Sequence, residues 1–571
     1  MSDQNRSTLL AVSYWLAAPA LLIGPLLSYL KFNGYPLYAY EALLAIALFV
    51  AVGLAISLAN QKASPPVRVG LMTLTSVAIL DQFFVGAGEH GPEAAITAIA
   101  SVVGLGLVPV VYLIVIIALA YFWARIAFAH VLVAVSFGVM AIAIAVTPAG
   151  TTQITSRNIL KDVPINADLP PLLHIIVDEH QGLAGFPADV PGGTGLAQDL
   201  QQRYRDLGFA VYPNAYSSYA QTAFAIPALL NNETGRIVGK SLSWRDGVAT
   251  LKKNRWLSSL ASQGYQVRVY GSSYLDFCED EAVHFCQRYP RNSIQSLFAT
   301  DLPATQKARV IIDTFSDGLL AVWFANQAIQ GIRKLFLDWS VETDPAWQKK
   351  APRLGPLAAH ATLTDVAADI QAGAAGRAFF AHLILPHYSY VFEEDCKLVQ
   401  NAGLWLNRDQ QIGRNSAQGR EMRYRRYVQQ TKCVHTALQE VYAALKSVEM
   451  FDKSIIVLHG DHGSRIGRMN VNPSTQDMVS RQDLIDTYST FYAVKTPGTA
   501  GAVHLDVRSI QELFAHHFSK SALNDHNDPL YLRDEVGSKG PTNLEKPLRT
   551  ITMPLDFPRT EKATNSTIIE N

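Results

Sequence analysis

Charged residues are scarce in this sequence, and the scarcity is local. Only 17% of the 571 residues are charged, against roughly 25% in an ordinary soluble chain. Residues 1–150 hold ten charged side chains, whereas the rest of the chain is about one-fifth charged, close to the soluble norm. The sequence therefore predicts a membrane part followed by a water-soluble part.

An excess of either sign is also missing, because 48 Lys and Arg residues face 48 Asp and Glu residues. This balance argues against a nucleic-acid partner. The length exceeds what a single core supports, so at least two domains are expected.

Cysteine is rare, and residues 1–150 contain none. The four cysteines are Cys278, Cys286, Cys396 and Cys433. None has the close paired spacing of a structural zinc site. An even number of cysteines in a region expected outside the cytoplasm indicates two disulfides. Of three possible pairings, sequence proximity favours Cys278–Cys286 and Cys396–Cys433.

Long apolar runs fill the first 150 residues, at about 9–30, 37–59, 67–88, 94–123 and 126–148. Each reaches the ~20 residues that a transmembrane helix needs, so five spans are expected, and a lone signal peptide is excluded. With the N-terminus inside, the loops on the cytoplasmic side carry four Lys and Arg residues and those on the opposite side carry one. This difference predicts a cytoplasmic N-terminus. The chain is thus predicted to be a multi-pass plasma (inner) membrane protein whose later residues are periplasmic or extracellular.

Three polar features accompany the apolar runs. Glu41 and Asp81 lie in or near spans, and the simpler interpretation puts both near the membrane surface. Residues 315–337 are apolar but carry one polar face, so an amphipathic helix fits them better than a sixth span.

The soluble part alternates short apolar runs with helical patterns. Residues 151–170 are predicted to form a linker, 171–523 a catalytic domain and 524–571 a polar tail. Apolar runs occur at 172–177, 266–270, 379–385, 454–458 and 490–494, with helical patterns at 195–207, 256–263 and 420–447. This alternation predicts a three-layer α/β domain with a mainly parallel sheet.

Acids and histidines follow several of the expected strands. They are Asp178, Glu179 and His180 after the first run, His382 and His387 around the third, and His459, Asp461 and His462 around the fourth. Parallel strands bring their carboxyl ends to one edge of the sheet. Carboxylate and imidazole ligands together suit zinc or manganese.

These motifs resemble, in order and spacing, the membrane-anchored sulfatase-like branch of the alkaline phosphatase superfamily. The resemblance rests on Val177-Asp178-Glu179, on residues 214–230 with Thr222, and on Asp461-His462-Gly463. That branch includes phosphoethanolamine transferases and lipoteichoic acid synthases. The resemblance implies five transmembrane helices followed by an alkaline-phosphatase-like domain outside the cytoplasm.

The resemblance also implies roles for individual residues. Glu179 matches the acidic metal ligand after the first strand, and Asp178 shares that position in the wider sulfatase group. Asp461 and His462 match the Asp-His ligand pair, and Thr222 matches the threonine nucleophile.

Other assignments keep alternatives open. Ser217 or Ser218 could replace Thr222 as the attacking group. His387 is assigned to the transferred group or the leaving alkoxide, and His382 either binds substrate or is a hydrogen-bonded core histidine. His180 and Arg465 are candidate substrate-binding residues, and His459 lies near the same edge.

The sequence thus predicts a metal-dependent phosphotransferase that moves a phospholipid head group, such as phosphoethanolamine or phosphoglycerol, to an envelope lipid or glycan through phosphothreonine. The alternative is a hydrolase, a phosphodiesterase or sulfatase with water as acceptor. The sole match to the formylglycine motif of sulfatases, at residues 64–68, lies in a predicted cytoplasmic loop, so that form is excluded. A catalytically inactive receptor and a transporter both fit the motifs less well.

Overall fold

A computed structural model gives the structure of the chain. It describes residues 3–64, 129–146, 164–232, 242–245, 248–289, 294–317, 354–406, 416–469, 477–519, 530–532 and 549–551, with a few single positions between them. The chain divides into two compact units. Unit 1 comprises Met1–Ile154, Asn292–Lys349 and Gln400–Leu406, and unit 2 comprises Thr155–Arg291, Lys350–Val399 and Asn407–Asn571.

Unit 1 is helical in the part that the structure describes. Its helices are α1 (Asp3–Phe32), α2 (Tyr40–Lys62), α6 (Ala129–Val146), α10 (Gln295–Phe298), α11 (Ala304–Asp317) and α14 (Gly403–Leu406). Helix α1 packs on α2 and α6, and α11 packs on α2. Gly53 of α2 lies against the Pro19 backbone of α1, where an added Cβ would approach it to 2.6 Å. Small residues of this kind allow close approach between apolar helices.

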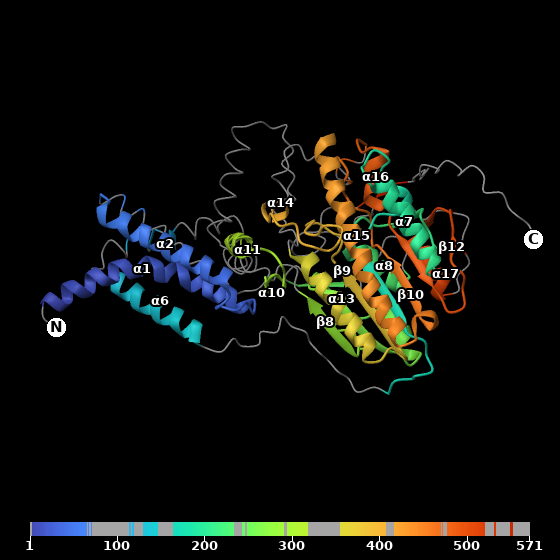
Figure 1. Ribbon diagram of the computed structural model, residues 1–571, viewed down its shortest axis with the longest axis horizontal. Coiled ribbons are helices and arrows are strands. Elements are labelled where there is room, and N and C mark those ends of the chain that lie inside the picture. Colours follow the sequence, from blue (N-terminus) through green and yellow to red (C-terminus); the bar gives the residue numbers. More distant parts are fainter. Residues whose placement is uncertain are drawn as a thin grey trace, which may run out of the picture. The chain divides into compact units, whose positions relative to one another are not determined.

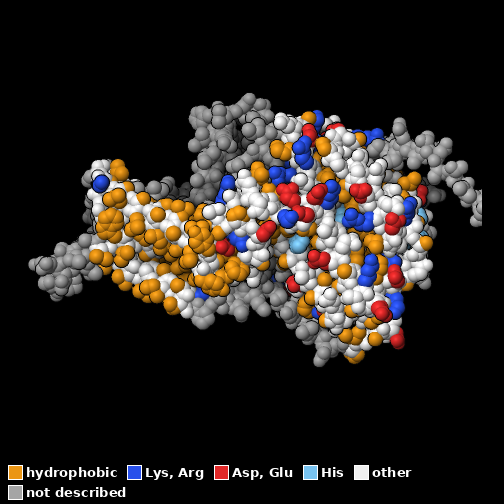
Figure 2. Space-filling view, viewed as in Figure 1, with side chains coloured by type: hydrophobic (Ala, Val, Ile, Leu, Met, Phe, Trp, Pro, Cys, Tyr) orange, Lys and Arg blue, Asp and Glu red, His pale blue; other side chains and the backbone are white. Residues whose placement is uncertain are grey.

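Two helices of unit 1 are long and apolar enough to cross a membrane, at Trp15–Phe32 and Tyr40–Lys62. They correspond to the first two predicted spans, and the apolar helix α6 lies within the fifth. The third and fourth predicted spans, with Asp81, lie almost entirely outside the described residues, so the prediction of five spans is not tested. Apolar side chains cover much of the visible surface of these helices (Figure 2). Leu43, Val52 and Ile142 are among their exposed apolar residues.

Unit 2 is built on a mainly parallel sheet. Its strand order is β12-β2-β11-β10-β1-β9-β6-β8, with bounds Ala502–Val503, Ala210–Val211, Tyr492–Lys495, Ile455–His459, Leu172–Val177, Arg377–Leu383, Gln266–Ser272 and Phe285–Tyr289. Only β11 runs antiparallel to its neighbours in this sheet. Every residue of β1 is buried, as expected for a central strand covered on both faces.

Helices cover both faces of the sheet. The main core joins alternate side chains of β1, β9, β6 and β10 to helices α8 (Thr222–Asn231), α9 (Arg255–Ser262) and α17 (Ile510–Ser519). Helices α13 (Gly355–Gln371) and α15 (Ala417–Ser447) contact each other and lie side by side over the sheet in Figure 1. The three-layer α/β prediction is confirmed within the described part of the chain.

The remaining elements of unit 2 are peripheral. The helices are α7 (Gly193–Asp206) and α16 (Arg481–Tyr488), and small sheets pair β13 (Arg508–Ser509) with β3 (Ala215–Tyr216), β14 (Leu530–Leu532) with β15 (Arg549–Ile551), and β5 (Val248–Leu251) with both β4 (Leu242–Arg245) and β7 (Leu275–Asp276). The predicted amphipathic helix at 315–337 is described only to Asp317, where α11 ends. The predicted tail at 524–571 lies almost entirely outside the described residues.

Both disulfides pair as proximity predicted. Cys278 is bonded to Cys286 and Cys396 to Cys433, with Cα–Cα separations of 5.5 and 4.8 Å, which lie within the usual range. The second bond ties the segment after β9 to helix α15.

Candidate active site

Three parallel strands bring the predicted polar residues to one edge of the sheet. Strand β1 lies between β10 and β9, and Ile176 pairs in register with His459 on one side and His382 on the other. Asp178 follows β1 directly, and Asp461 follows β10 after one glycine. The amide of Glu179 donates to Asp461 Oδ1 at 3.1 Å, so the two strand ends are joined.

Asp178, Asp461 and His462 form a cluster of possible metal ligands. One ligand atom of each lies within 4.8 Å of the others, and all three side chains are buried. Nε2 of His462 lies 3.3 Å from Asp461 Oδ2 and 3.8 Å from Asp178 Oδ1. Among the residues that the structure describes, Asp178 Oδ1 and Asp461 Oδ2 have no hydrogen-bond partner. Buried carboxylate oxygens without a donor are costly, and a divalent cation with oxygen and imidazole ligands fits them.

The electrostatics of the cluster also favour a cation. Burial and the Asp461 carboxylate together raise the pKa of Asp178 to about 7. Burial also opposes ionisation of Asp461, but the adjacent His462 outweighs it and holds the pKa of Asp461 below its usual value. Two carboxyl groups this close ionise together only with nearby positive charge, which a divalent ion would supply.

Thr222 brings a hydroxyl to the same cluster. It is the first residue of helix α8 and is buried. Its Oγ1 lies 3.3 Å from His462 Nε2. A helix N-terminus favours bound anions such as phosphate. The hydroxyl is therefore placed between the ligand cluster and a position suited to a phosphoryl group.

The two alternative serines lie just before this helix. Ser217 Oγ accepts the Tyr219 amide at 3.3 Å, and Ser218 Oγ is buried with no hydrogen-bond partner among the described residues. Among the described interactions, only Thr222 of the three contacts His462 or Asp461. This geometry favours Thr222 as the attacking group.

Glu179 is not one of the three clustered ligands and contacts a separate group of side chains. Its backbone has a left-handed φ of 62°, so successive side chains diverge. Glu179 Oε1 accepts Arg465 Nε at 2.8 Å and lies 3.4 Å from His387 Nε2. In the structure, Asp178 rather than Glu179 joins Asp461 and His462. The metal-ligand role of Glu179 stays a prediction, and its observed partner is Arg465.

His387 and Arg465 complete that edge group. Arg465 Nη2 lies 3.4 Å from His387 Nε2, and its side chain is 35% exposed. Burial disfavours the Arg465 charge, but Glu179 and Asp178 outweigh it and raise the pKa of the guanidinium. A permanent cation that is part exposed beside the cluster suits a phosphate oxygen. The predicted substrate contacts of Arg465 and His387 are thus geometrically feasible.

His382 faces the ligand cluster from strand β9. Its Nε2 lies 3.6 Å from Asp178 Oδ2, and neither ring nitrogen has a hydrogen-bond partner in the described part of the chain. Burial lowers the pKa of His382 to about 4, so the ring is neutral. The alternative of a hydrogen-bonded core histidine does not fit this site, whereas a contact with a ligand or a cation does.

His180 and His459 lie in the core instead of at the site. His180 Nδ1 contacts Gln181 O at 2.8 Å, and its Nε2 contacts His435 Nε2 at 2.7 Å. His459 Nδ1 likewise contacts Gly460 O at 2.7 Å, and its Nε2 contacts His174 Nε2 at 2.8 Å. Both ring nitrogens of His180 are occupied, which argues against the predicted substrate contact. The cause is the turn after β1, which directs this side chain inward.

Helix α15 supplies supporting residues that the sequence did not indicate. Tyr427 Oη donates to Glu179 O and accepts the Gln181 amide, both at 2.8 Å. Gln430 Nε2 donates to the carbonyls of Pro386, His387 and Ser389, and its Oε1 accepts the Val391 amide at 2.7 Å. One helix therefore holds the segments after both β1 and β9. No sequence pattern marks such contacts, because they link backbone groups far apart in the chain.

No protein-family model matches the chain, and no curated protein matches it. Solved structures similar to it include a phosphonate monoester hydrolase of Agrobacterium radiobacter, at 12% identity and a TM-score of 0.37 over 62% of this chain and 73% of that one. The C-terminal periplasmic domain of EcEptC from Escherichia coli gives 11% identity and a TM-score of 0.38 over 69% and 97%.

A third neighbour is a protein from Bacteroides fragilis described as a sulfatase, at 14% identity and a TM-score of 0.37 over 66% of this chain and 83% of that one. At such low identity and TM-score, the assignment of function rests on the residues of this chain.

Proposed function

We propose that the chain is a membrane-anchored, metal-dependent phosphotransferase that moves a phospholipid head group to an envelope lipid or glycan through phospho-Thr222. The observation that carries this proposal is the Thr222 hydroxyl beside the buried Asp178, Asp461 and His462 cluster. A threonine hydroxyl attacks poorly unless its environment activates it. The two apolar helices of unit 1 support membrane anchoring.

Asp178, Asp461 and His462 would hold the metal, with zinc and manganese as the ions that suit these ligands. When bound, such an ion lowers the pKa of an adjacent hydroxyl and offsets charge on phosphoryl oxygens. His462 Nδ1 contacts Gly463 O at 3.0 Å. If that nitrogen carries the proton, the Nε2 lone pair faces Thr222 and the two carboxylates.

The remaining residues bind and orient the phosphodiester. The N-terminus of α8 and the Arg465 guanidinium both favour its negative charge. Thr222 Oγ1 then loses its proton and forms a bond to phosphorus as the bond to the lipid glycerol oxygen breaks, and that oxygen takes up a proton, so that diacylglycerol leaves. An acceptor hydroxyl later displaces Thr222. Water in that second step gives the alternative function, a phosphodiesterase.

The decisive experiment incubates the full-length protein with phospholipid labelled in its head group and examines the Thr222 peptide by mass spectrometry. A head-group phosphate adduct is expected on wild type, and none on Thr222→Val. Ser217→Ala and Ser218→Ala serve as matched controls that retain the adduct. An adduct on either serine would overturn the assignment, and steady release of free head group without transfer would identify the hydrolase.

A further inference from the structure

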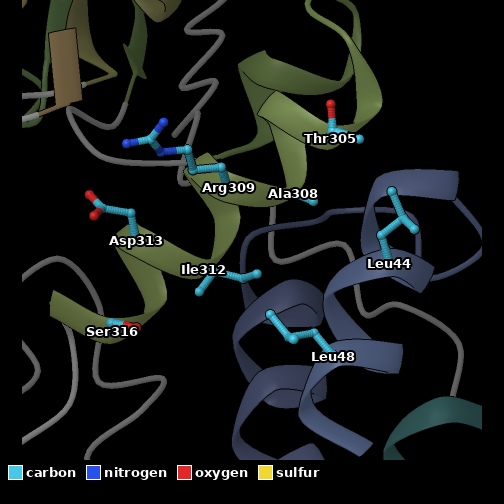
Figure 3. Close-up of a pocket in the computed structure, with 8 residues that line it drawn as sticks. All are labelled: Leu44, Leu48, Thr305, Ala308, Arg309, Ile312, Asp313 and Ser316. Atoms are coloured by element: carbon cyan, nitrogen blue, oxygen red, sulfur yellow. The ribbon is translucent and has the colours of Figure 1, made fainter. Parts of the chain in front are cut away.

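A groove of about 450 Å³ lies between helices α2 and α11 of unit 1 (Figure 3). Leu44, Leu48 and Ile312 give it apolar walls. Arg309 and Asp313 lie on the side of α11 away from the two leucines, so their charges do not face the apolar wall. Apolar packing of this kind does not specify the chemistry of a ligand. A buried network of charged side chains lies instead in unit 2, beside helix α16.

The loop after strand β10, residues 463–469, is bound to the last turn of α16. The amide of Arg465 donates to Asp486 O at 2.7 Å. The amide of Gly463 donates to Thr487 O at 2.9 Å. The last carbonyl groups of a helix have no partner within the helix, and here two of them accept hydrogen bonds from the loop that follows the metal-ligand cluster.

Two glycines allow this loop to lie close to α16. A Cβ added at Gly463 would approach Asp486 O to 2.4 Å. A Cβ added at Gly467 would approach Asp483 Oδ1 to 2.6 Å. The same Asp483 oxygen accepts the Arg468 amide at 2.7 Å. Both ends of α16 therefore determine the path of the loop.

Arg465 depends on this support because its backbone is left-handed, with a φ of 51°. A residue other than glycine rarely adopts this backbone, which persists where the surrounding structure holds it. The Arg465 amide is bound to Asp486 O, and its guanidinium is bound to Glu179 Oε1. The direction of the side chain is therefore set through the backbone as well as through the guanidinium.

The side chain of Asp486 anchors the end of α16 in the core. Its buried Oδ1 accepts hydrogen bonds from the Tyr424 hydroxyl and from Gln482 Nε2. Gln181 Nε2 donates to the same oxygen at 3.3 Å. Oδ2 lies 3.5 Å from Arg420 Nη2. Tyr424 and Arg420 belong to α15, and Gln181 belongs to the segment after β1, so one carboxylate joins three parts of unit 2.

We propose that Asp486 is a positioning residue for Arg465. Its carboxylate fixes the end of α16, and its carbonyl fixes the Arg465 backbone, so that the guanidinium meets the phosphate beside the ligand cluster. The inference rests on the proposed function, in which Arg465 binds the negative charge of the phosphodiester. Asp486 thereby controls the affinity for substrate, and it acts through Arg465.

The test is a double-mutant cycle on full-length, metal-loaded protein in detergent, carrying Thr222→Val so that no phosphoenzyme forms. Inorganic phosphate is titrated, and its Kd is measured by calorimetry. Arg465→Gln should weaken phosphate binding roughly tenfold, since it removes a charge-assisted contact. Asp486→Asn should weaken it about fivefold, because a displaced guanidinium loses part of that contact. Combined with Arg465→Gln, it should have no further effect, since the two residues act as one unit.

Asp189→Asn is the matched control. Asp189 is an exposed carboxylate that also pairs with Arg420, with Oδ2 at 3.4 Å from Nη1, and its substitution should leave phosphate binding unchanged. With Thr222 restored, Asp486→Asn should raise the KM for phospholipid and leave kcat unchanged, as expected for a loss of binding alone.

Tyr424→Phe carries the test if Asp486→Asn does not fold. It removes one donor to the Asp486 carboxylate and retains the charge. It should weaken phosphate binding less than Asp486→Asn does, and again only when Arg465 is present.

Three results would overturn the proposal. Equal weakening by Asp486→Asn with and without Arg465 would show a structural role. Unchanged phosphate binding in folded Asp486→Asn would show no role, and loss of metal from it would place the effect at the ligand cluster. If Arg465→Gln itself leaves binding unchanged, the phosphate contact of the proposed function fails, and the positioning role fails with it.

Discussion

At the scale of single residues, the two acids after β1 have different partners. Asp178 faces Asp461 and His462, and Glu179 faces Arg465 and His387. Asp178 and Glu179 are adjacent in the chain, yet the left-handed backbone at Glu179 separates their two carboxylates. One acid is thus available to a cation and the other to the substrate side of the site.

This division predicts different effects for two equivalent substitutions. Asp178→Asn should weaken metal binding at least tenfold, because it removes an anionic ligand. Glu179→Gln should retain the metal and raise the KM for substrate, because Arg465 loses its partner. Metal content after dialysis against a chelator measures the first effect. Metal loss in Glu179→Gln, with metal retained in Asp178→Asn, would restore Glu179 as the ligand.

The sequence was informative about these residues only in part. Asp461, His462 and Thr222 could be recognised because the motif fixes them next to a strand end or a helix start. The separate directions of Asp178, Glu179 and His180 could not, because they depend on one backbone φ value. A side chain three residues from a strand can enter the site or the core with little change in sequence.

At the scale of elements, helix α15 acts as a brace for the active-site loops. Tyr427 holds the segment after β1, and Gln430 holds the segment after β9. The disulfide between Cys396 and Cys433 fastens the same helix to the second segment. The apolar pattern predicted this helix and the strands it covers, but periodicity carries no information on which backbone groups its polar side chains reach.

Removing one hydroxyl from this brace should therefore affect the site. Tyr427→Phe removes the hydroxyl that bonds the Glu179 carbonyl and the Gln181 amide, which should cost about 1–3 kcal/mol of unfolding free energy and weaken metal retention. Tyr492→Phe is the matched control, because the buried Tyr492 hydroxyl has no hydrogen-bond partner within the residues that the structure describes. Denaturant unfolding with parallel metal analysis gives both readouts. Equal loss in the two variants would contradict the role of Tyr427.

At the scale of the whole molecule, buried neutral histidines link stability to pH. His435 contacts His180 and accepts a contact from Tyr204 Oη at 2.7 Å. Burial, with the nearby charges of His180 and Arg203, lowers the pKa of His435 well below 6.5. The unfolded chain takes up this proton near pH 6.5, but the folded chain does not.

The part of the unfolding free energy that depends on neutral His435 should therefore be fully present above pH 6.5. It should decline as the pH falls below 6.5. Each such histidine contributes a slope of about 1.4 kcal/mol per pH unit. His435→Gln should lower stability at pH 7.5 yet flatten the decline between pH 6.5 and 5. Unfolding midpoints measured across this range test the sign. An unchanged slope in His435→Gln would show that His435 does not contribute.

The discontinuous path of the chain has a practical consequence for preparing the catalytic unit. Unit 1 takes in Asn292–Lys349 and Gln400–Leu406, which follow part of unit 2 in the sequence. A fragment that starts at residue 155 would keep α11 but lose α2, and the apolar side of α11 would face water. Such a fragment is expected to self-associate. A soluble enzyme fragment would need both returning segments replaced by short polar connections, not merely an N-terminal cut.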